Sequence, residues 1–230
     1  MTTRIAWVAG STGGIGSECG RRLAEDGWQV IGSDRPEVDI ATAGSAEAWL
    51  PGALGDAALD GAVHAVGMSG RRLGDGPLTA CTDEAWDEVL RVDLTSVFRF
   101  LRLALRAAAD GASIVVIGSA LATTLDRDFL TTAYRTAKAA IVPLVEAAAY
   151  EGAARGIRVN VVSAGLVDTP MATRALGDPQ IAARLPELMP LGARAVSPAE
   201  IAQAVAWLLG PDSARTTGAV IPVDGGWSLR

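Results

Sequence analysis

The sequence predicts an α/β fold in which a doubly wound parallel sheet carries helices on both faces. Short apolar runs alternate with segments of helical pattern along the chain, as they do in consecutive strand and helix units. Half of the residues (50%) are hydrophobic, which suits strands that are buried on both faces. A chain of 230 residues is long enough for one such unit with a sizeable core, so we expect a single domain over residues 1–230.

Each expected strand is a short apolar run bounded by turn residues or by a helical pattern. The six runs lie near residues 5–9, 28–33, 61–66, 113–117, 157–162 and 219–223. A helical pattern extends from about Ser17 to Asp26, directly after the first strand and its turn. Ala-rich segments at 104–109 and 147–154 are good helix formers, and we expect them to be packing helices.

A glycine-rich turn, Gly10-Ser11-Thr12-Gly13-Gly14-Ile15-Gly16, joins the first strand to this helix. Glycine lets a backbone turn sharply and approach a pyrophosphate, while the next helix directs free N–H groups and its positive dipole end at the anion. The spacing differs from G-x-G-x-x-G, and no Lys-Ser/Thr pair follows as a P-loop requires. The turn alone therefore fits either a structural or a dinucleotide-binding role.

Asp34 ends the second apolar run, about twenty residues after the glycine turn. A carboxylate at this place accepts hydrogen bonds from the hydroxyls of an adenosine ribose and would repel a 2′-phosphate, so Asp34 favours NAD over NADP. Arg35 leaves alternatives open, because its guanidinium can pair with Asp34, stack on adenine or assist a phosphate.

Tyr134 and Lys138 stand one helical turn apart, and Ser119 closes a strongly apolar, strand-like run fifteen positions before Tyr134. A phenol is a poor acid, with an ordinary pKa of about 10, but an ammonium group on the same helix face favours the phenolate by Coulomb attraction. We therefore expect Lys138 to make Tyr134 a proton donor and acceptor. A solvated helix face would show the same Tyr-x-x-x-Lys spacing, and Ser119 alone could be a strand-end turn residue.

The order of the glycine turn, Asp34, Ser119, Tyr134 and Lys138 resembles the short-chain dehydrogenase/reductase family, and the likeness covers essentially the whole chain. The turn is similar to the family's Thr-Gly-x-x-x-Gly-Ile-Gly loop. Residues 158–171 look like its nicotinamide-side loop and residues 223–227 like its C-terminal signature. The resemblance implies a single-domain Rossmann-type fold and an NAD(P)-dependent alcohol dehydrogenase or ketoreductase.

Three positions depart from the family pattern. Asp93 stands where the family usually has an asparagine that holds a water near the lysine; an aspartate could preserve that contact while adding a negative charge. His64-Ala65-Val66-Gly67 replaces Asn-Asn-Ala-Gly, and Ala164 replaces a proline. His64, the sole histidine, lies at a strand end, where we expect a hydrogen-bonded structural role rather than acid–base catalysis. The connection from Asp34 to Ser45 leaves little room for the helix that family members often have there.

The resemblance implies the role of each site residue. Ser119 would hydrogen-bond the substrate oxygen, Tyr134 would transfer the proton, Lys138 would stabilise the phenolate and bind the nicotinamide ribose, and Asp93 would belong to the relay. Asp39 and Ile40 would be a strand-end pair beside adenine. The complete set expected to bind NAD is Gly10, Ser11, Thr12, Gly13, Gly14, Ile15, Gly16, Asp34, Arg35, Asp39, Ile40, Ala65, Val66, Gly67, Tyr134, Lys138, Gly165, Val167 and Thr169.

Substrate identity must come from the segments that flank this centre, and we expect a lid at about 170–195. The apolar residues expected to contact substrate are Leu121, Leu125, Phe129, Met171, Leu185, Leu188 and Met189. They favour a lipophilic or cyclic secondary alcohol, unless half of them simply pack the lid onto the core. Three arginines, Arg127, Arg174 and Arg184, could instead meet an acidic substrate.

Composition restricts the possible partners. The net charge is -6 without a basic cluster, so we expect no nucleic acid, and no apolar stretch is long enough for a membrane span. The start of the chain, residues 1–4, leads directly into the first strand, which favours the cytoplasm. With one histidine and two cysteines at unsuitable spacing, we expect no metal site. Apolar helix faces near 94–108 and 136–152 resemble those that pair subunits in the family, so we expect a homodimer or homotetramer.

Three functions from different classes remain open at this point. The chain is an NAD-dependent dehydrogenase, a family member with non-redox chemistry such as dehydration or epimerisation, or a catalytically silent NAD-binding regulator. The presence of Ser119, Tyr134 and Lys138 favours the first, whereas Asp93 and Ala164 leave the third open.

Overall fold

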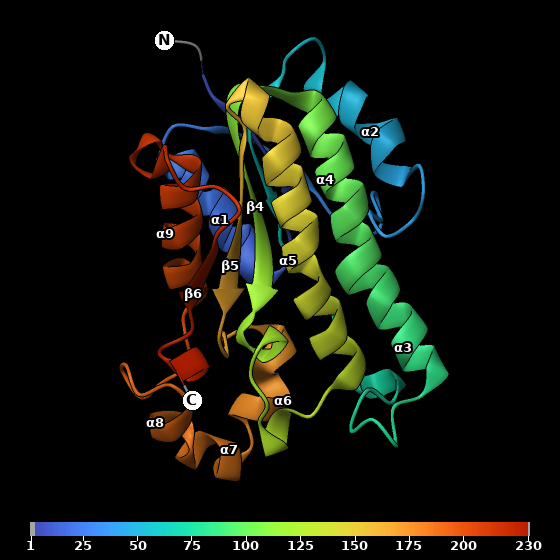
Figure 1. Cartoon of the computed structure of the whole chain (residues 1–230), viewed down its shortest axis with the longest axis vertical. Helices are drawn as coiled ribbons and strands as arrows, with labels where there is room; N and C mark the ends of the chain where they lie inside the picture. The colour runs from blue at the N-terminus through green and yellow to red at the C-terminus, as the bar shows by residue number, and fades with distance from the viewer. Residues whose placement is uncertain (1–2, 230) are drawn as a thin grey trace.

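Six parallel strands form one sheet at the centre of the molecule (Figure 1). The computed structural model describes residues 3–229 of the chain. The strands are β1 (Ile5–Ala9), β2 (Gln29–Ser33), β3 (Leu59–His64), β4 (Ala108–Ser119), β5 (Arg158–Ala164) and β6 (Val220–Val223). Their order across the sheet is β2-β1-β3-β4-β5-β6, which confirms the predicted doubly wound parallel sheet and all six of its strands.

The register of the strands brings their carboxyl ends to one edge of the sheet. Ala9 of β1 lies opposite Ser33 of β2 on one side and His64 of β3 on the other. Ser119 at the end of β4 lies opposite Ala164 of β5. The neighbouring strands β1 and β3 are followed by strands on opposite sides, β2 on one side and β4 on the other. Ligands of such sheets bind in the crevice at this switch point. The segments that follow each strand therefore meet at one place.

Helices α1 (Gly14–Glu25) and α9 (Pro198–Leu209) cover one face of the sheet, at the left of Figure 1. Both present apolar side chains to the strands, and Leu23, Val205 and Leu208 are fully buried there. The start of α9 is fixed by Ser197, whose hydroxyl accepts the N–H of Glu200 in a capping box.

The opposite face is covered by α2 (Ser45–Leu54), α4 (Ser96–Ala107) and α5 (Thr132–Gly152). Helix α3 (Asp83–Leu90) runs into α4 through the π-helical turn η2 (Arg91–Thr95), so 83–107 is one continuous helical segment. Trp7 of β1 packs on Phe100 of α4 with ring centroids 4.7 Å apart, and both are fully buried. π-Helical turns are frequent at functional sites, and this one contains Asp93.

Short helices lie beyond the carboxyl edge of the sheet, at the bottom of Figure 1. They are α6 (Thr173–Leu176), α7 (Pro179–Ala183) and α8 (Leu185–Leu188), all within the segment 170–195 for which a lid is predicted. The single turns of 3₁₀ helix are η1 (Arg71–Leu73), η3 (Ala120–Ala122), η4 (Arg127–Phe129), η5 (Ala153–Arg155), η6 (Pro170–Ala172), η7 (Pro211–Ser213) and η8 (Trp227–Leu229).

The segment between β2 and α2 contains neither helix nor strand, as the short connection from Asp34 to Ser45 predicts. The prediction that Asp39 and Ile40 end a strand is wrong. The carboxylate of Asp39 instead accepts the N–H of Ala41 at 2.9 Å and so holds a turn. Ile40 is buried in the apolar cluster beside it.

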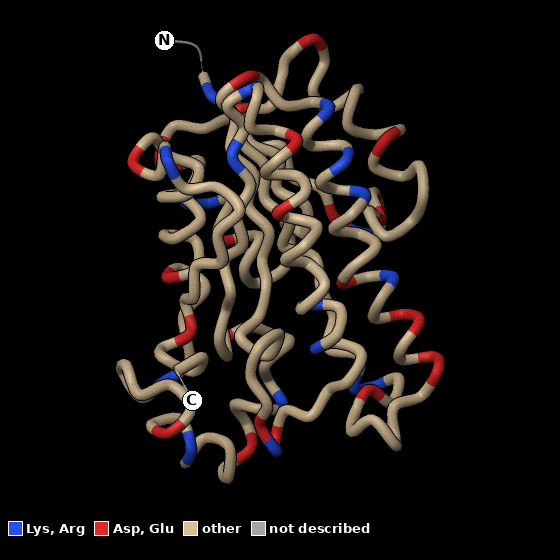
Figure 2. The backbone as a smooth tube through the Cα atoms, in the orientation of Figure 1, with Lys and Arg blue, Asp and Glu red and all other residues tan. Residues whose placement is uncertain are grey.

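Charged residues of both signs are interspersed along the helices and loops in the view of Figure 2. No helix within residues 3–229 is both long and apolar enough to cross a membrane. In the same part of the chain, no three His, Cys, Asp or Glu side chains come close enough together to hold a metal ion.

Candidate active site and cofactor cleft

A cavity of about 520 Å³ opens at the carboxyl edge of the sheet and contains three of the four predicted catalytic side chains, those of Ser119, Tyr134 and Lys138. Its other lining residues are Ile15, Ala65, Val66, Gly67, Ser69, Arg71, Arg72, Ile117, Gly118, Ala120, Leu121, Phe129, Thr131, Ala164, Gly165, Leu166, Val167, Thr169, Pro170, Met171, Ala172, Thr173, Arg174, Ala175 and Trp227. The structure thus brings together the ends of three strands, the start of α5 and the lid.

Tyr134 lies between Ser119 and Lys138. The Ser119 hydroxyl lies near enough to the phenol of Tyr134 to lower its pKa, and it accepts the N–H of Leu121 at 3.2 Å. The ammonium of Lys138 lies 5.6 Å from the centre of the Tyr134 ring, and its Nζ donates to the carbonyl oxygen of Ile117 at 3.4 Å. The solvated-face alternative is therefore excluded, because Lys138 is buried.

Asp93 forms a direct ion pair with Lys138. The distance from Lys138 Nζ to Asp93 Oδ1 is 3.1 Å, and neither side chain is exposed by more than 4%. The same carboxylate accepts the backbone N–H of Met68 at 3.1 Å. Gly67 is required beside the pair, because a Cβ there would lie 2.8 Å from Asp93 Oδ1. An aspartate at this position therefore contacts the lysine without an intervening group.

The pKa of Tyr134 differs from the expectation drawn from Lys138 alone. Burial and the negative charge of Asp93 raise the pKa of Tyr134, and burial has the larger effect. The positive charge of Lys138 and the nearby Ser119 hydroxyl lower it. The net result is a pKa above the ordinary value of 10.0. Lys138 does favour the phenolate, but burial outweighs that attraction. Tyr134 is accordingly a neutral phenol, ready to donate a proton, near neutral pH.

Burial alone would lower the pKa of Lys138, but the negative charges of Asp93 and of the Tyr134 phenolate raise it above 10.5. Burial raises the pKa of Asp93, and the ion pair with Lys138 opposes that rise. Lys138 therefore keeps its positive charge next to Tyr134 over the neutral pH range.

Asp75, which sequence reasoning missed, fixes the start of the helix that carries Tyr134. Its buried carboxylate accepts the backbone N–H groups of Ala133 and Tyr134, both at 3.0 Å. The residue that precedes the helix, Thr131, makes no such capping bond with its side chain. Asp75 therefore caps α5 from 59 residues away and holds the backbone of Tyr134, the predicted proton donor.

His64 has the structural role predicted for it. Its Nε2 lies 2.9 Å from Ser96 Oγ, whose own proton is donated to the carbonyl of Val92. Burial, with the positive charge of Lys138, lowers the pKa of His64 to about 3. The imidazole is therefore neutral at any working pH and cannot exchange protons in catalysis.

The glycine turn has the shape that a pyrophosphate requires. Gly10 adopts a φ of 83°, and a Cβ there would lie 2.8 Å from the carbonyl carbon of Ala65. Gly14 faces Thr169 so closely that a Cβ would lie 2.7 Å from Thr169 Cγ2. No side chain caps α1, so its first N–H groups are free for an anion. The residues of this turn thus fit a dinucleotide cofactor.

A second, smaller cavity of about 130 Å³ adjoins the first and contains Asp34. Its lining is Gly10, Gly13, Asp34, Arg35, Val38, Asp39, Ile40, Ala65, Val66, Gly67 and Val92. Both cavities have Ala65, Val66 and Gly67 in their linings, so they lie next to each other at the switch point, and together they are called the cleft. This position suits a cofactor with a nicotinamide end and an adenosine end.

Asp34 is held by the glycine turn itself. Its Oδ2 accepts the N–H of Thr12 at 3.0 Å and the Thr12 hydroxyl at 2.6 Å, and its Oδ1 accepts the N–H of Arg35 at 2.8 Å. Partial burial would raise the pKa of Asp34, but these hydrogen bonds lower it below the ordinary value. The carboxylate is therefore charged at neutral pH.

Most cofactor residues predicted from the sequence line the cleft. The exceptions are Ser11, Thr12, Gly14 and Gly16, which shape the turn behind it, with Thr12 bonded to Asp34 and Gly14 packed on Thr169. Gly16 packs on the turn as well, because a Cβ there would lie 2.0 Å from the carbonyl oxygen of Gly10.

The predicted substrate residues divide into two groups. Leu121, Phe129 and Met171 line the large cavity, and Phe129 packs edge-on against Trp227 with ring centroids 4.9 Å apart. The other four lie elsewhere: Leu125 is 70% exposed at the surface, Leu185 packs against the core, and Leu188 and Met189 are fully buried in it. These four are corrected to packing or surface positions. The segment 185–189 turns its apolar side chains to the core, and Leu125 lies in an exposed loop.

The three arginines considered for an acidic substrate also differ in position. Arg174 lines the cavity. Arg184 instead forms ion pairs with Asp126, at 2.7 Å, and with Asp128. These ion pairs connect the start of α8 to the segment between β4 and α5. Arg127 is exposed and lies outside the cavity lining. Two further arginines that the sequence did not single out, Arg71 and Arg72, line the cavity with Arg174.

Comparison with known proteins is consistent with this architecture. A family model described as enoyl-(acyl carrier protein) reductase matches residues 37–228. The chain is 35% identical over 197 residues to short-chain dehydrogenase/reductase ABA4 of Pyricularia oryzae, with 83% of this chain and 71% of that relative aligned. It is 32% identical over 245 residues to cis-4-hydroxycyclohexanecarboxylate dehydrogenase of Sinomonas cyclohexanicum, which aligns 98% of this chain and 96% of that relative.

A solved structure shows the same fold. A variant of actinorhodin polyketide ketoreductase, in complex with NADPH, superimposes with a TM-score of 0.87 at 28% identity, over 99% of this chain and 98% of the other. The chain belongs to the short-chain dehydrogenase/reductase family of oxidoreductases.

Proposed function

We propose that this chain is an NAD-dependent oxidoreductase that interconverts a secondary alcohol and a ketone. The observation that carries the proposal is the convergence of Ser119, Tyr134 and Lys138 on one cavity that also reaches the glycine turn. A hydroxyl donor, a neutral phenol and a fixed positive charge are the groups needed to move one proton to or from a substrate oxygen.

The cofactor would lie along the cleft, with its pyrophosphate at the start of α1, its adenosine ribose at Asp34 and its nicotinamide beside Thr169 and Gly165. When bound, a nicotinamide cofactor supplies or accepts the hydride. Val167 and Thr169 would hold the nicotinamide end, because both line the cavity beyond β5.

In ketone reduction, the Ser119 hydroxyl donates a hydrogen bond to the carbonyl oxygen and Tyr134 donates its proton to the same oxygen. The phenolate that forms at Tyr134 is stabilised by Lys138, whose charge is held by the ion pair with Asp93. Alcohol oxidation follows the reverse path, in which the Tyr134 phenolate removes the hydroxyl proton. The raised pKa of Tyr134 favours reduction at neutral pH and oxidation at alkaline pH.

NAD is preferred in this proposal because a charged Asp34 stands where a 2′-phosphate would have to bind. The NADPH in the related ketoreductase belongs to that protein and argues for testing both cofactors. Arg35, which borders the same small cavity, is the residue through which NADP would be accommodated if the proposal were wrong.

The substrate we propose is a lipophilic or cyclic secondary alcohol, or the ketone derived from it. Leu121, Phe129 and Met171 supply apolar surface on the cavity wall, with Leu166 and Trp227 beside them. One relative is named for acting on a hydroxylated cyclohexane ring. A ring of that kind fits an apolar wall that faces Tyr134.

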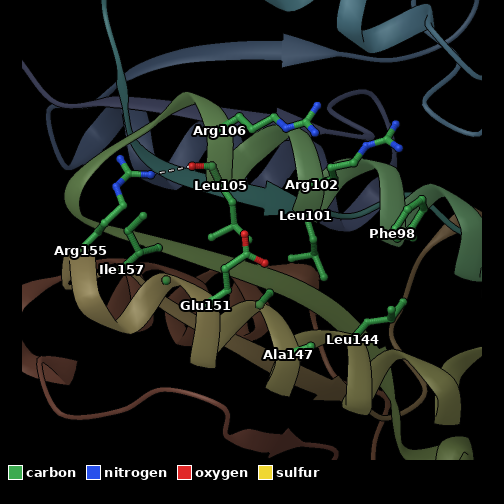
Figure 3. A pocket seen from close by; sticks show the side chains of 12 residues that line it. Phe98, Leu101, Arg102, Leu105, Arg106, Leu144, Ala147, Glu151, Arg155 and Ile157 are labelled. Carbon is green, nitrogen blue, oxygen red and sulfur yellow. Dashed lines mark hydrogen bonds between the residues drawn. The ribbon is translucent and has the colours of Figure 1, made fainter.

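We also propose that the chain forms a homo-oligomer through a groove of about 420 Å³ between α4 and α5. Figure 3 shows Leu101, Leu105, Leu144 and Ile157 along this groove, with Phe98 at one end. Phe98 is 46% exposed, and Arg155 donates to the carbonyl of Leu105 at the other end. The lining also contains charged residues of both signs, Arg102, Arg106, Glu151 and Arg155. A groove with apolar side chains and charges of both signs between two long helices suits self-association by an isologous contact. A cytoplasmic location stays a prediction.

The test is a spectrophotometric assay of cofactor reduction and oxidation with cyclic, aromatic, steroidal and short-chain secondary alcohols and ketones, each with NAD and with NADP. We expect turnover with NAD. Loss of substrate without net change in the cofactor would indicate the non-redox alternative. NAD binding without any turnover across the panel would indicate the silent regulator.

A further inference from the structure

Three arginines gather at the substrate cavity and have no acidic neighbour in its lining. Arg71 and Arg72 come from η1, after β3, and Arg174 comes from α6 in the lid. The fourth cation of the lining, Lys138, is already paired with Asp93. The described lining contains no aspartate or glutamate, although the chain has 26 acids against 20 lysines and arginines. The cavity is thus a positive site in a negatively charged protein.

The guanidinium groups of this cluster are not satisfied by carboxylates. Arg71 is half-buried, and its Nη2 donates only to the backbone carbonyl of Asp128 at 3.1 Å. Within the described part of the chain, Arg72 and Arg174 make neither an ion pair nor a hydrogen bond. By contrast, Arg91 and Arg184 each bond a carboxylate.

Arg71 and Arg174 lie close enough to repel each other. Burial lowers the pKa of Arg71 and the positive charge of Arg174 lowers it further, whereas the negative charge of Asp75 opposes both. The Asp75 carboxylate is itself engaged by the N–H groups of Ala133 and Tyr134. Arg174 is exposed, so water screens part of this repulsion, and an anion bound between the two guanidinium groups would remove the rest. A guanidinium binds a carboxylate with two parallel hydrogen bonds, so a pair of them can grip one carboxylate firmly.

We propose that the substrate of this enzyme carries a carboxylate at the end remote from its reacting hydroxyl or carbonyl, and that Arg71 and Arg174 bind it, with Arg72 adding positive charge. This inference rests on the proposed function, because it uses the same cavity and the same reacting centre. The substrate class becomes a hydroxy acid and the corresponding oxo acid with an apolar body between the two polar ends.

The competing role for these arginines is to hold the pyrophosphate of the cofactor. The pyrophosphate is expected at the glycine turn, which the first N–H groups of α1 already serve. Arg71 instead donates to the carbonyl oxygen of Asp128, in the segment that leads into α5 and Tyr134. The two roles differ in what an arginine substitution should weaken. A carboxylate-binding role predicts a weaker preference for acids, and a pyrophosphate-binding role predicts a weaker affinity for NAD.

The experiment measures binding by calorimetry to the whole protein saturated with oxidised NAD. The probes are 4-oxopentanoate, 5-oxohexanoate and 6-oxoheptanoate, each with its neutral methyl ester. An oxo acid and an oxidised cofactor cannot react with each other, so binding is separated from turnover. The series varies the spacing between the carbonyl and the carboxylate. The variants are Arg71→Gln, Arg174→Gln and, as a matched control outside the cavity, Arg127→Gln.

We expect at least one acid to bind the wild type about ten-fold more tightly than its ester, as one charge-assisted contact would provide. This preference should shrink in Arg71→Gln and Arg174→Gln, persist in Arg127→Gln and weaken with added salt. Equal binding of acid and ester by the wild type overturns the inference. Loss of NAD affinity in Arg174→Gln with an unchanged acid preference also overturns it, in favour of the pyrophosphate role.

The outcome is independent of whether the proposed reaction occurs. Turnover of neutral ketones with no preference for acids would leave the proposed function standing and remove this inference. Preferential binding of an acid without turnover of any substrate would support the carboxylate site while contradicting the proposed reaction.

Discussion

Tyr134 shows why one pair of residues does not decide a pKa. The spacing to Lys138 correctly predicts their proximity and the attraction that favours the phenolate. Burial and the charge of Asp93 oppose that attraction, and both depend on contacts that the local sequence does not specify. Asp93 lies 45 residues before Lys138 and reaches it only because the π-helical turn packs against α5.

Substitution of Asp93 by asparagine should shift the pH dependence of alcohol oxidation to lower pH. The Asp93 charge raises the pKa of Tyr134, so its removal lowers that pKa as long as Lys138 stays protonated, and the phenolate then forms at lower pH. Lys138 keeps the carbonyl oxygen of Ile117 as an acceptor for its ammonium group in this variant. Asparagine keeps an acceptor for the N–H of Met68. The measurement is the rate of oxidation against pH for wild type and Asp93→Asn, with thermal unfolding of both as the control for folding. A pH profile that is unchanged or shifted to higher pH would contradict the effect of the Asp93 charge on the pKa of Tyr134.

Asp34 should determine the choice of cofactor. We expect Asp34→Ala and Asp34→Asn to lose about ten-fold or more of the selectivity for NAD over NADP, since both remove the charge that repels a 2′-phosphate. Asparagine keeps an acceptor for Thr12, so it separates the effect of the charge from that of the turn. The readout is kcat/KM with each cofactor. Unchanged selectivity in both variants would exclude Asp34 as the determinant.

Among the elements, the strands were the most predictable part of the fold. Each β-strand is a short apolar run between turn signals, and the run at 5–9 coincides with β1. The site depends on elements brought together from far apart in the sequence. Asp75 caps α5 from a distant part of the chain, and the charges of Arg71 and Arg174 interact although about a hundred residues separate them. No local sequence pattern identifies either interaction.

The lid segment is a second case in which local sequence does not identify the partner of a side chain. Leu188 and Met189 lie in a segment with the composition of a substrate loop, but α8 directs them into the core, where they are fully buried. Apolar composition predicts burial without telling whether the partner is substrate or protein.

Loss of the α5 cap should affect both stability and turnover. We expect Asp75→Ala to lower the free energy of unfolding by about 1–2 kcal/mol, because two N–H groups lose their acceptor, and to lower kcat as the backbone of Tyr134 loosens. Asp75→Asn should have a higher free energy of unfolding and a higher kcat than Asp75→Ala, because its amide oxygen can still accept an N–H group. Urea unfolding and steady-state kinetics provide the two readouts.

Ser197→Ala provides the matched control, since it removes the cap of α9 outside the cavity lining. It should lose stability without losing kcat. If Asp75→Ala and Ser197→Ala behave alike in kinetics, Asp75 has no particular part in positioning Tyr134.

At the scale of the whole molecule, the proposed active site and the proposed subunit interface lie in different parts of the fold. The carboxyl edge carries the cleft, whereas the groove between α4 and α5 lies on the outer surface of one helical layer (Figures 1 and 3). The sequence predicts apolar helix faces here, but only the fold shows that a groove between them remains open.

Phe98→Glu should therefore lower the molecular mass of the protein in solution toward that of one chain, because it places a charge in the groove. Leu78→Glu is the matched control, since Leu78 is 77% exposed and lies outside the groove. Light scattering coupled to size exclusion gives the mass of each. An assembled Phe98→Glu protein would show that subunits pair elsewhere, and a monomeric wild type would remove the proposal.

The most direct test of the central claim compares Tyr134→Phe with Tyr150→Phe, the exposed tyrosine at the other end of the same helix. Turnover of the best substrate with NAD and the dissociation constant of NAD are measured for both. The account predicts that Tyr134→Phe loses about 10²- to 10⁴-fold in kcat, the usual contribution of general acid–base catalysis, while NAD still binds. Tyr150→Phe should keep wild-type turnover. Substantial turnover by Tyr134→Phe with NAD bound would contradict the claim that this phenol transfers the proton.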